Sequence, residues 1–157
     1  MSFAVHPSSA HSPHVALSVP RRWTTRGAPA PGVALLARAP AAAASGFTPE
    51  LVLHTGPVDG AATLAEWREE AMATLTTQLE GFELEDADLV DVGAAPAAYR
   101  RFSHRLGDVD VLCDQWAWLV EELGIVLTGT VARTDYADYC DLFEDVAATV
   151  EVRPHAA

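Results

Sequence analysis

A cysteine and a histidine are the first residues whose types could support nucleophilic chemistry. Cys113 and His104 are predicted on one face of two paired strands, where an imidazole could act as a base toward a thiol. A reactive cysteine needs surroundings that lower its thiol pKa, and nothing near Cys113 in the sequence supplies them. Ser103 cannot pair with His104, because consecutive strand side chains point to opposite faces. We therefore expect a buried thiol beside a core histidine, and no catalytic residue.

The sequence carries no recognisable metal-binding or nucleotide-binding motif. The histidines form no HxH or HExxH pattern, and Cys113 and Cys140 lie too far apart for CxxC spacing. The acidic residues at 83–91 and in the last predicted helix lack the loop pattern of a calcium site, so we expect solvated faces. The 10 glycines form neither GxGxxG nor a phosphate-binding loop. The sequence therefore predicts no metal and no cofactor.

Two tryptophans lie two residues apart in the stretch "DQWAWLV". A hairpin turn at Gly107-Asp108 would place a tyrosine, an arginine and an aspartate on the same strand face as the two tryptophans. Either a second layer of structure covers the tryptophans, which we favour, or they form an exposed aromatic patch for a partner or ligand. The candidate partner or ligand surface consists of Trp116, Trp118, Tyr99, Arg101 and Asp114.

Composition narrows the choice of partners. The chain has 157 residues, which suits one domain, and a formal net charge of -12 from 22 acidic and 10 basic residues. Such a surface repels phosphate and anionic lipid, so we expect neither nucleic acid nor a membrane as partner. The N-terminal stretch lacks the basic and unbroken apolar segments of a secretory signal, and we expect a cytoplasmic protein with two buried free thiols.

The elements that must position these residues follow from periodicity. Alternating apolar residues predict strands at 14–20, 33–40 and 50–56, with 21–32 as a connection. A stripe with helical spacing predicts a helix over 64–80, whose apolar residues are Leu64, Trp67, Ala71, Leu75 and Leu79. Thr63 and Glu66 form a capping box at its start, and Gly81 supplies its end. A strand near 82–93 follows.

The stretch from 96 to 131 predicts two successive hairpins. Gly107-Asp108 is a favourable two-residue turn, which determines the strand register. One face then pairs Arg105 with Asp110, Arg101 with Asp114, and Tyr99 with Trp116. The other face pairs Leu106 with Val109, His104 with Val111, Phe102 with Cys113, and Ala98 with Ala117. Opposite charges and aromatic rings pair on the first face, and mostly apolar side chains pair on the second. A shift of the register by one residue would destroy both sets of pairs.

The C-terminal part completes the domain. A loop over 121–123 returns the chain into a strand, and we expect its residues Ile125, Leu127 and Val131 on the face of Cys113 and Ala117. Thr134 is the predicted N-cap of a last helix whose apolar stripe includes Phe143. The predicted organisation is a flexible arm at 1–12, one α+β domain at 13–152 and a flexible tail at 153–157. An antiparallel sheet of about six to seven strands flanked by helices is expected.

Several stretches together resemble a known family: "SVPRRW", "ELVLHTGPV", "TLAEW", "GFELED", the double hairpin, and Asp135-Tyr136 opening a helix. The chain resembles PsbP/Mog-like proteins, and among them the small actinobacterial LpqN-type proteins, over residues 14–152. The resemblance implies an α-β-α sandwich and a non-enzymatic role. The lipoprotein members carry a signal and a lipobox cysteine that this sequence lacks. The shared motifs are structural, so the resemblance transfers no site residue.

Two functional expectations follow. The first is a non-catalytic cytoplasmic interaction or adaptor protein, with an unidentified protein partner or a second copy of the chain in a homodimer. The second is a small-molecule-binding protein or enzyme, with a pocket between helix 64–80 and the sheet. That pocket would be lined by Trp67, Trp116 or Trp118, together with polar groups such as Arg101 and Asp114.

Overall fold

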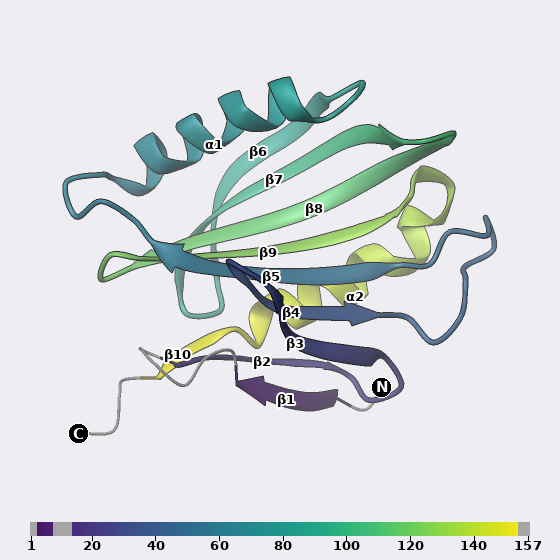
Figure 1. Cartoon of the computed structure of the whole chain (residues 1–157), viewed down its shortest axis with the longest axis horizontal. Helices are drawn as coiled ribbons and strands as arrows, with labels where there is room; N and C mark the ends of the chain where they lie inside the picture. Colours follow the sequence, from purple (N-terminus) through teal and green to yellow (C-terminus); the bar gives the residue numbers. More distant parts are fainter. Residues whose placement is uncertain (1–2, 8–13, 154–157) are drawn as a thin grey trace.

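The computed structural model describes residues 3–7 and 14–153 (Figure 1). Its elements, in chain order, are β1 (Phe3–Pro7), β2 (His14–Pro20), β3 (Thr24–Ala30), β4 (Val33–Arg38), β5 (Glu50–Pro57), α1 (Leu64–Gln78), β6 (Glu83–Val92), β7 (Ala95–Leu106), β8 (Val109–Val120), β9 (Leu123–Ala132), a 3-10 turn (Arg133–Asp135), α2 (Tyr136–Ala148) and β10 (Glu151–Arg153).

Seven strands form one antiparallel sheet in the order β3-β4-β5-β9-β8-β7-β6. A small antiparallel sheet, β1-β2-β10, packs beside α2 on one face of this sheet, and α1 covers the other face (Figure 1). The α+β class, the antiparallel sheet and the flanking helices are as predicted. The strand at 14–20, however, belongs to the small sheet.

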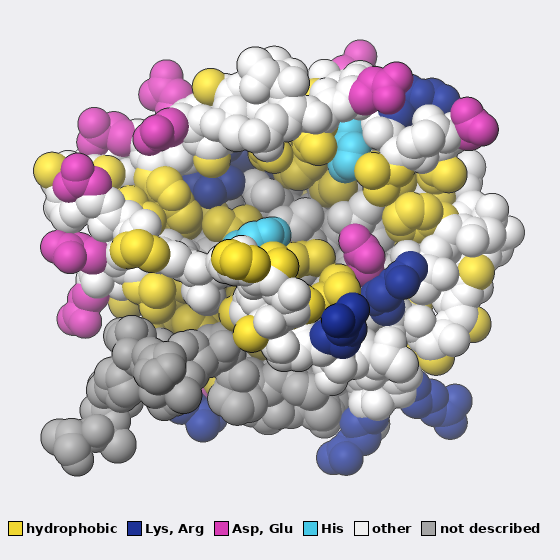
Figure 2. All heavy atoms as spheres, in the orientation of Figure 1, with side chains coloured by type: hydrophobic (Ala, Val, Ile, Leu, Met, Phe, Trp, Pro, Cys, Tyr) yellow, Lys and Arg dark blue, Asp and Glu magenta, His cyan; other side chains and the backbone are white. Residues whose placement is uncertain are grey.

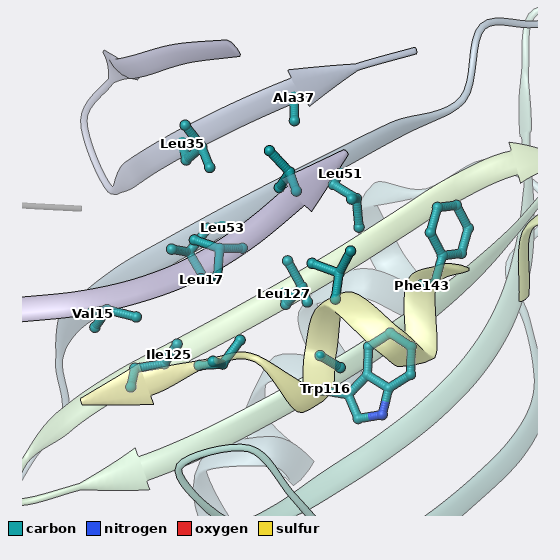
Figure 3. Close-up of a cluster of buried hydrophobic side chains, with 14 of the residues drawn as sticks. Val15, Leu17, Leu35, Ala37, Leu51, Leu53, Trp116, Ile125, Leu127 and Phe143 are labelled. Carbon is teal, nitrogen blue, oxygen red and sulfur yellow. The ribbon is translucent and has the colours of Figure 1, made fainter. Parts of the chain in front are cut away.

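The main core lies between the large sheet and the layer formed by β2 and α2 (Figure 3). Val15 and Leu17 of β2 meet Leu51 and Leu53 of β5 there, and all four side chains are almost completely buried. Burial of a side chain of this size contributes about 1.5–3 kcal/mol. The small sheet thus supplies one wall of the core and holds α2 in place.

A glycine lets α2 approach the sheet. A Cβ atom added to Gly129 of β9 would lie 2.6 Å from the ring of Phe143, a distance that real Cβ atoms do not adopt. Phe143 is fully buried against this part of the sheet. The missing side chain therefore makes the space that seats the helix over β8 and β9.

The β7–β8 hairpin has the predicted register at every pair, from Leu106 and Val109 through Arg101 and Asp114 to Ala98 and Ala117. The paired charges, Arg105 with Asp110 and Arg101 with Asp114, form no salt bridge with each other among the described residues. Asp110 pairs with Arg133, at 2.9 Å between Oδ2 and Nε. Cross-strand register is therefore set by the turn, while the choice of ion partner depends on a third element.

The predicted face of β9 is wrong. The β8–β9 turn has two residues, Glu121 and Glu122, both with positive φ, so Val120 pairs with Leu123. The expected three-residue loop shifts the register by one residue, which moves every side chain to the other face. In the structure Leu127 pairs with Trp116, and Ile125 pairs with Trp118. Ile125, Leu127 and Val131 therefore share the face of the two tryptophans.

Other differences concern local signals. The predicted connection 21–32 contains β3, although Trp23 is buried in the core as a connection anchor would be. The predicted N-cap Thr134 lies inside the 3-10 turn, and Asp135 precedes α2 without a capping hydrogen bond. The Asp135 carboxylate instead accepts hydrogen bonds from the backbone N–H and hydroxyl of Ser45. A tertiary contact has replaced the local cap.

The chain ends also differ. Residues 1–12 are predicted as a flexible arm, whereas Phe3–Pro7 form β1 on β2; the rest of that arm lies outside the described residues. The predicted tail 153–157 begins at the last residue of β10, which pairs with β2, and 154–157 are not described. The helix predicted at 64–80 ends at Gln78, and its capping box is present as predicted.

Candidate functional site

The five residues of the candidate surface lie together on the face of the large sheet that α2 covers. Tyr99 is opposite Trp116, and their ring centroids are 5.4 Å apart. Trp118 is fully buried, and its indole N–H donates to the Val92 carbonyl at 2.8 Å. Trp116 is 4% exposed. The favoured alternative, tryptophans covered by a second layer, is therefore confirmed, and Trp118 serves the core.

Asp114 lies at the centre of this face. Its side chain is 2% exposed, although it carries a carboxyl group. The Tyr99 hydroxyl donates to Oδ1 at 2.5 Å, and the Tyr136 hydroxyl lies 3.0 and 2.9 Å from the two carboxyl oxygens. The carboxyl group therefore joins β7, β8 and the first turn of α2 through two phenol groups.

Burial dominates the protonation of this cluster. Removal from water raises the pKa of Asp114, although hydrogen bonds from the two tyrosines and the charge of Arg101 act in the opposite direction. Burial, followed by the hydrogen bond to Asp114, also raises the pKa of Tyr99. Burial raises the pKa of Tyr136 as well. Both phenols therefore stay protonated and act as hydrogen-bond donors at neutral pH.

Beside Asp114 is a pocket of about 550 Å³ between β6, β7, β8 and α2. Four of the five candidate residues line it: Tyr99, Arg101, Asp114 and Trp116. Helix α2 contributes Tyr136, Cys140 and Glu144 to the lining. We call this space the acidic pocket, because its lining includes the acidic residues Asp86, Asp88, Asp91, Asp114 and Glu144.

Arg101 is the basic residue of the pocket lining. Its guanidinium carbon lies 5.7 Å from the centroid of the Tyr136 ring, a cation–π arrangement. The lining has one arginine and five acidic residues, so acidic residues outnumber basic ones around the pocket. Three aromatic rings, those of Tyr99, Trp116 and Tyr136, complete the surroundings that a cation would meet.

The sequence prediction did not include the α2 and β6 residues of this site. The acidic stretch 83–91 is predicted as a solvated face, and Asp86, Asp88 and Asp91 are exposed as predicted. The same three residues line the acidic pocket. The pairing of Asp88 with Tyr99 brings β6 to the site. Period-two alternation could have placed Asp86 and Asp88 on one strand face. The contribution of α2 has no signal in the sequence, because it depends on helix packing.

The predicted pocket beneath helix 64–80 brings together the wrong residues. Trp67 of α1 lies on the opposite face of the sheet, where its ring packs so close to Gly124 that a Cβ there would lie 2.6 Å from it. The acidic pocket, with Arg101 and Asp114, lies beside α2. Arg68 of α1 contacts Gln115, and adjacent strand residues point to opposite faces, so Trp116 lies across the sheet from α1. Trp118, which has the same phase on β8, is likewise separated from Trp67.

Cys113 lies on the α1 side of the sheet. It is 1% exposed, and its sulfur lies 3.4 Å from the Thr130 hydroxyl. Burial raises the pKa of the Cys113 thiol to about 12, which opposes the thiolate that a nucleophile requires. Cys140 is free too, but it is half-buried, where complete burial is predicted. Neither thiol has the surroundings of a reactive cysteine.

Residues 3–7 and 14–153 hold no group of three or more His, Cys, Asp or Glu side chains arranged to bind a metal ion. Neither α1 nor α2 combines the length and apolar character of a membrane-crossing helix.

Comparison with known proteins identifies the fold. No family model matches the sequence, and no curated protein matches it. Among solved structures, LpqN of Mycobacterium tuberculosis, described as involved in cell envelope biogenesis, superposes with a TM-score of 0.74 at 16% identity, covering 98% of this chain and 93% of LpqN.

Two other solved structures are also similar. PA94 of Pseudomonas aeruginosa, a protein of unknown function described as a putative regulator, gives a TM-score of 0.68 at 15% identity, with 99% of this chain and 100% of PA94 covered. The cyanobacterial PsbP of Synechocystis sp. PCC 6803 gives 0.67 at 15% identity, with 97% and 94% covered. The chain therefore has the PsbP-like fold, shared with LpqN, that the sequence resemblance implies.

Proposed function

We propose that this protein is a non-catalytic interaction module, an adaptor that receives a basic side chain of a protein partner in the acidic pocket. The observation that carries this proposal is the composition of the lining: five acidic residues and three aromatic residues with one arginine. A guanidinium or ammonium group would gain both electrostatic attraction and cation–π contact in such a place.

Strand β6 supports a protein as the partner. It forms one edge of the large sheet, so part of its backbone has no neighbouring strand. Leu89 is 72% exposed and Leu84 is 47% exposed on this strand, beside the aspartates of the pocket. An extended basic segment could contact these leucines while one of its side chains enters the pocket. Strand addition at a sheet edge is a common mode of peptide recognition.

The charge of β6 also bears on homodimers. Glu83, Glu85, Asp86, Asp88 and Asp91 lie on this edge strand, and charged edge residues discourage pairing between identical strands. We therefore propose a basic partner at this edge rather than a second copy of the acidic chain. The cytoplasm remains our proposed location, supported by the two free thiols, which are typical of a reducing compartment.

Peptide binding tests this proposal. An extended six-residue peptide with one central arginine would be titrated into the labelled protein by NMR, alongside the same peptide with neutral citrulline in place of arginine. We expect the arginine peptide to bind at least tenfold more tightly and to shift the signals of Tyr99, Trp116 and Tyr136. Raising the salt concentration should weaken the binding, because part of the attraction is electrostatic.

A double variant identifies the pocket. Asp88→Asn with Glu144→Gln removes two carboxylates of the lining while keeping similar shapes, and should weaken arginine-peptide binding at least fivefold. Asp108→Asn in the β7–β8 turn is the matched control, because Asp108 is exposed and lies outside the pocket lining. Equal binding of the arginine and citrulline peptides, or equal binding by the double variant, would contradict the proposal.

A small organic cation is the second candidate ligand. The pocket volume of about 550 Å³ lies within the range of about 300–1,000 Å³ typical of small-molecule sites. The same titration with choline and putrescine separates the candidates. Tighter binding of a free amine than of the arginine peptide would favour a small-molecule-binding protein over an adaptor.

A further inference from the structure

A buried arginine without an acidic partner lies on the opposite face of the sheet from the acidic pocket. Arg68 of α1 is 4% exposed. Its Nη2 donates to Gln115 Oε1 at 2.7 Å, while its buried Nε has no hydrogen-bond acceptor in the described structure. Within residues 3–7 and 14–153, no carboxylate forms a salt bridge with Arg68.

A second arginine lies next to it. Arg100 of β7 is half-buried, and its Nη1 donates to the backbone carbonyl of Arg68 at 2.7 Å. Arg100 likewise forms no salt bridge with any described carboxylate. Two guanidinium groups therefore occupy neighbouring positions between α1 and the sheet, and no carboxylate of the described residues forms an ion pair with either.

This arrangement is costly unless something else supplies negative charge. Burial, followed by repulsion from Arg100, lowers the pKa of Arg68 to about 10, which still leaves the guanidinium charged at neutral pH. The Trp67 ring, with its centroid 4.8 Å from the Arg68 guanidinium carbon, gives cation–π attraction but no charge. A buried charge needs a counter-ion as well as hydrogen bonds. The chain has 22 acidic residues and a net charge of -12, yet no described carboxylate pairs with these arginines, which suggests that the counter-charge comes from a ligand.

The space around these arginines is only partly filled. Apart from Arg68, no α1 residue is fully buried; Ala71, Met72 and Leu75 are half-buried. Figure 2 shows a hollow on this face below α1. Gln115 and Thr128 add polar groups on the sheet side, where the Gln115 amide N–H donates to the Thr128 hydroxyl at 3.1 Å.

We propose that the hollow beneath α1 is a binding site for an oxyanion, a carboxylate or phosphate group, held between Arg68 and Arg100. The planar guanidinium fork suits both groups, because each presents two oxygens to parallel N–H donors. The Thr128 hydroxyl can donate a further hydrogen bond. This site is independent of the acidic pocket, since the sheet separates the two and their ligands have opposite charge.

Anion titrations test the site. Inorganic phosphate and hexanoate would each be added to the full chain at constant ionic strength, with chloride as the background salt. Side-chain NMR signals of Arg68 and Arg100 and the midpoint of thermal unfolding would be followed. We expect a saturable shift with at least one of the two anions. The anion that binds more tightly shows whether the natural group is a phosphate or the carboxylate of an apolar molecule.

Three variants locate the binding. Arg68→Met and Arg100→Met should each weaken anion binding at least tenfold, whereas Arg26→Gln, an exposed arginine on β3, should leave it unchanged. In chloride buffer Arg68→Met should not unfold at a lower temperature than the wild type, because it removes an uncompensated buried charge. Arg100 is only half-buried, so Arg100→Met tests anion binding with less disturbance of the core than Arg68→Met.

Two results would overturn the proposal. The first is the absence of a saturable shift with both phosphate and hexanoate. The second is equal anion affinity in the wild type and in Arg68→Met and Arg100→Met, which would place binding elsewhere. Neither result concerns the arginine-peptide test of the acidic pocket, so the two proposals fail separately.

Discussion

Asp114 and Gln115 are consecutive residues of β8, yet they hold the two helices on opposite faces of the sheet. Asp114 accepts hydrogen bonds from Tyr136 of α2, and Gln115 accepts one from Arg68 of α1. Both side chains are buried and polar. One strand thus presents a carboxyl group to the acidic pocket and an amide group to the paired arginines.

The Tyr136 hydroxyl should contribute measurably to stability. Tyr136→Phe removes a donor that contacts both oxygens of Asp114, so the buried carboxyl group loses part of its hydrogen bonding. We expect the free energy of unfolding to fall by about 1–3 kcal/mol in a urea titration. Tyr139→Phe, on the same helix, is the matched control and should change it by less than about 0.5 kcal/mol. Equal effects of the two variants would contradict the role of the network.

Stability should depend on pH through Asp114. Folding raises the pKa of this carboxyl group above its ordinary value of 3.8, mainly through burial, so the folded state holds the proton more tightly. The resulting stabilisation is complete below that value and is lost as the pH rises through the folded pKa. The free energy of unfolding of the wild type minus that of Asp114→Asn should therefore fall as the pH rises from about 4 through the folded pKa.

Urea titrations of both proteins across this range measure the difference. A difference that increases with pH would show that the tyrosine hydrogen bonds and Arg101 outweigh burial at Asp114.

Gly129 should tolerate no side chain. In Gly129→Ala the new Cβ would lie 2.6 Å from Phe143, so the ring or the helix must shift, and we expect a loss of about 1–3 kcal/mol. Gly56→Ala on the adjacent strand is the control, because its Cβ would have no atom within 4 Å. Chemical denaturation compares the two. A loss of similar size in both variants would show that strand conformation, and not the contact with Phe143, is responsible.

The β8–β9 turn offers a stabilising change. Glu121 and Glu122 have φ of 48° and 67°, which costs a residue with a side chain about 1–2 kcal/mol. Replacing the pair with Asn-Gly, which prefers this two-residue turn, should raise the free energy of unfolding by about 1 kcal/mol. Glu121→Ala with Glu122→Ala removes the same charges without favouring positive φ. An equal gain in that control would assign the effect to charge repulsion.

The two thiols should differ in reactivity. Cys140 is half-buried, whereas Cys113 is buried and its pKa is raised to about 12. We expect a thiol reagent to modify Cys140 in the native protein and Cys113 only after unfolding, as resolved by peptide mass spectrometry. Cys140→Ser should then show no native-state labelling. Rapid labelling of Cys113 in that variant would show that the sheet opens beneath α1.

Features that depend on residues close in the chain were predictable. The capping box of α1 is present, with Thr63 and Glu66 exchanging hydrogen bonds of 3.1 Å. The Gly107-Asp108 turn places every pair of the β7–β8 hairpin correctly. The prediction of which face the β9 side chains occupy was wrong for a local reason as well. Glu121 and Glu122 adopt positive φ and form a two-residue turn, which in a sequence is usually recognised by glycine or asparagine.

The sequence by itself determined the strand face that carries Tyr99, Arg101, Asp114 and Trp116, because turn length and side-chain alternation are short-range properties of the chain. Only the tertiary structure decided which helix covers that face. Phe143 seats α2 over Gly129 of β9, and Arg68 joins α1 to Gln115 on the other side. Such contacts depend on the packing of segments far apart in the chain, so charge and periodicity alone could not place the acidic pocket beside α2.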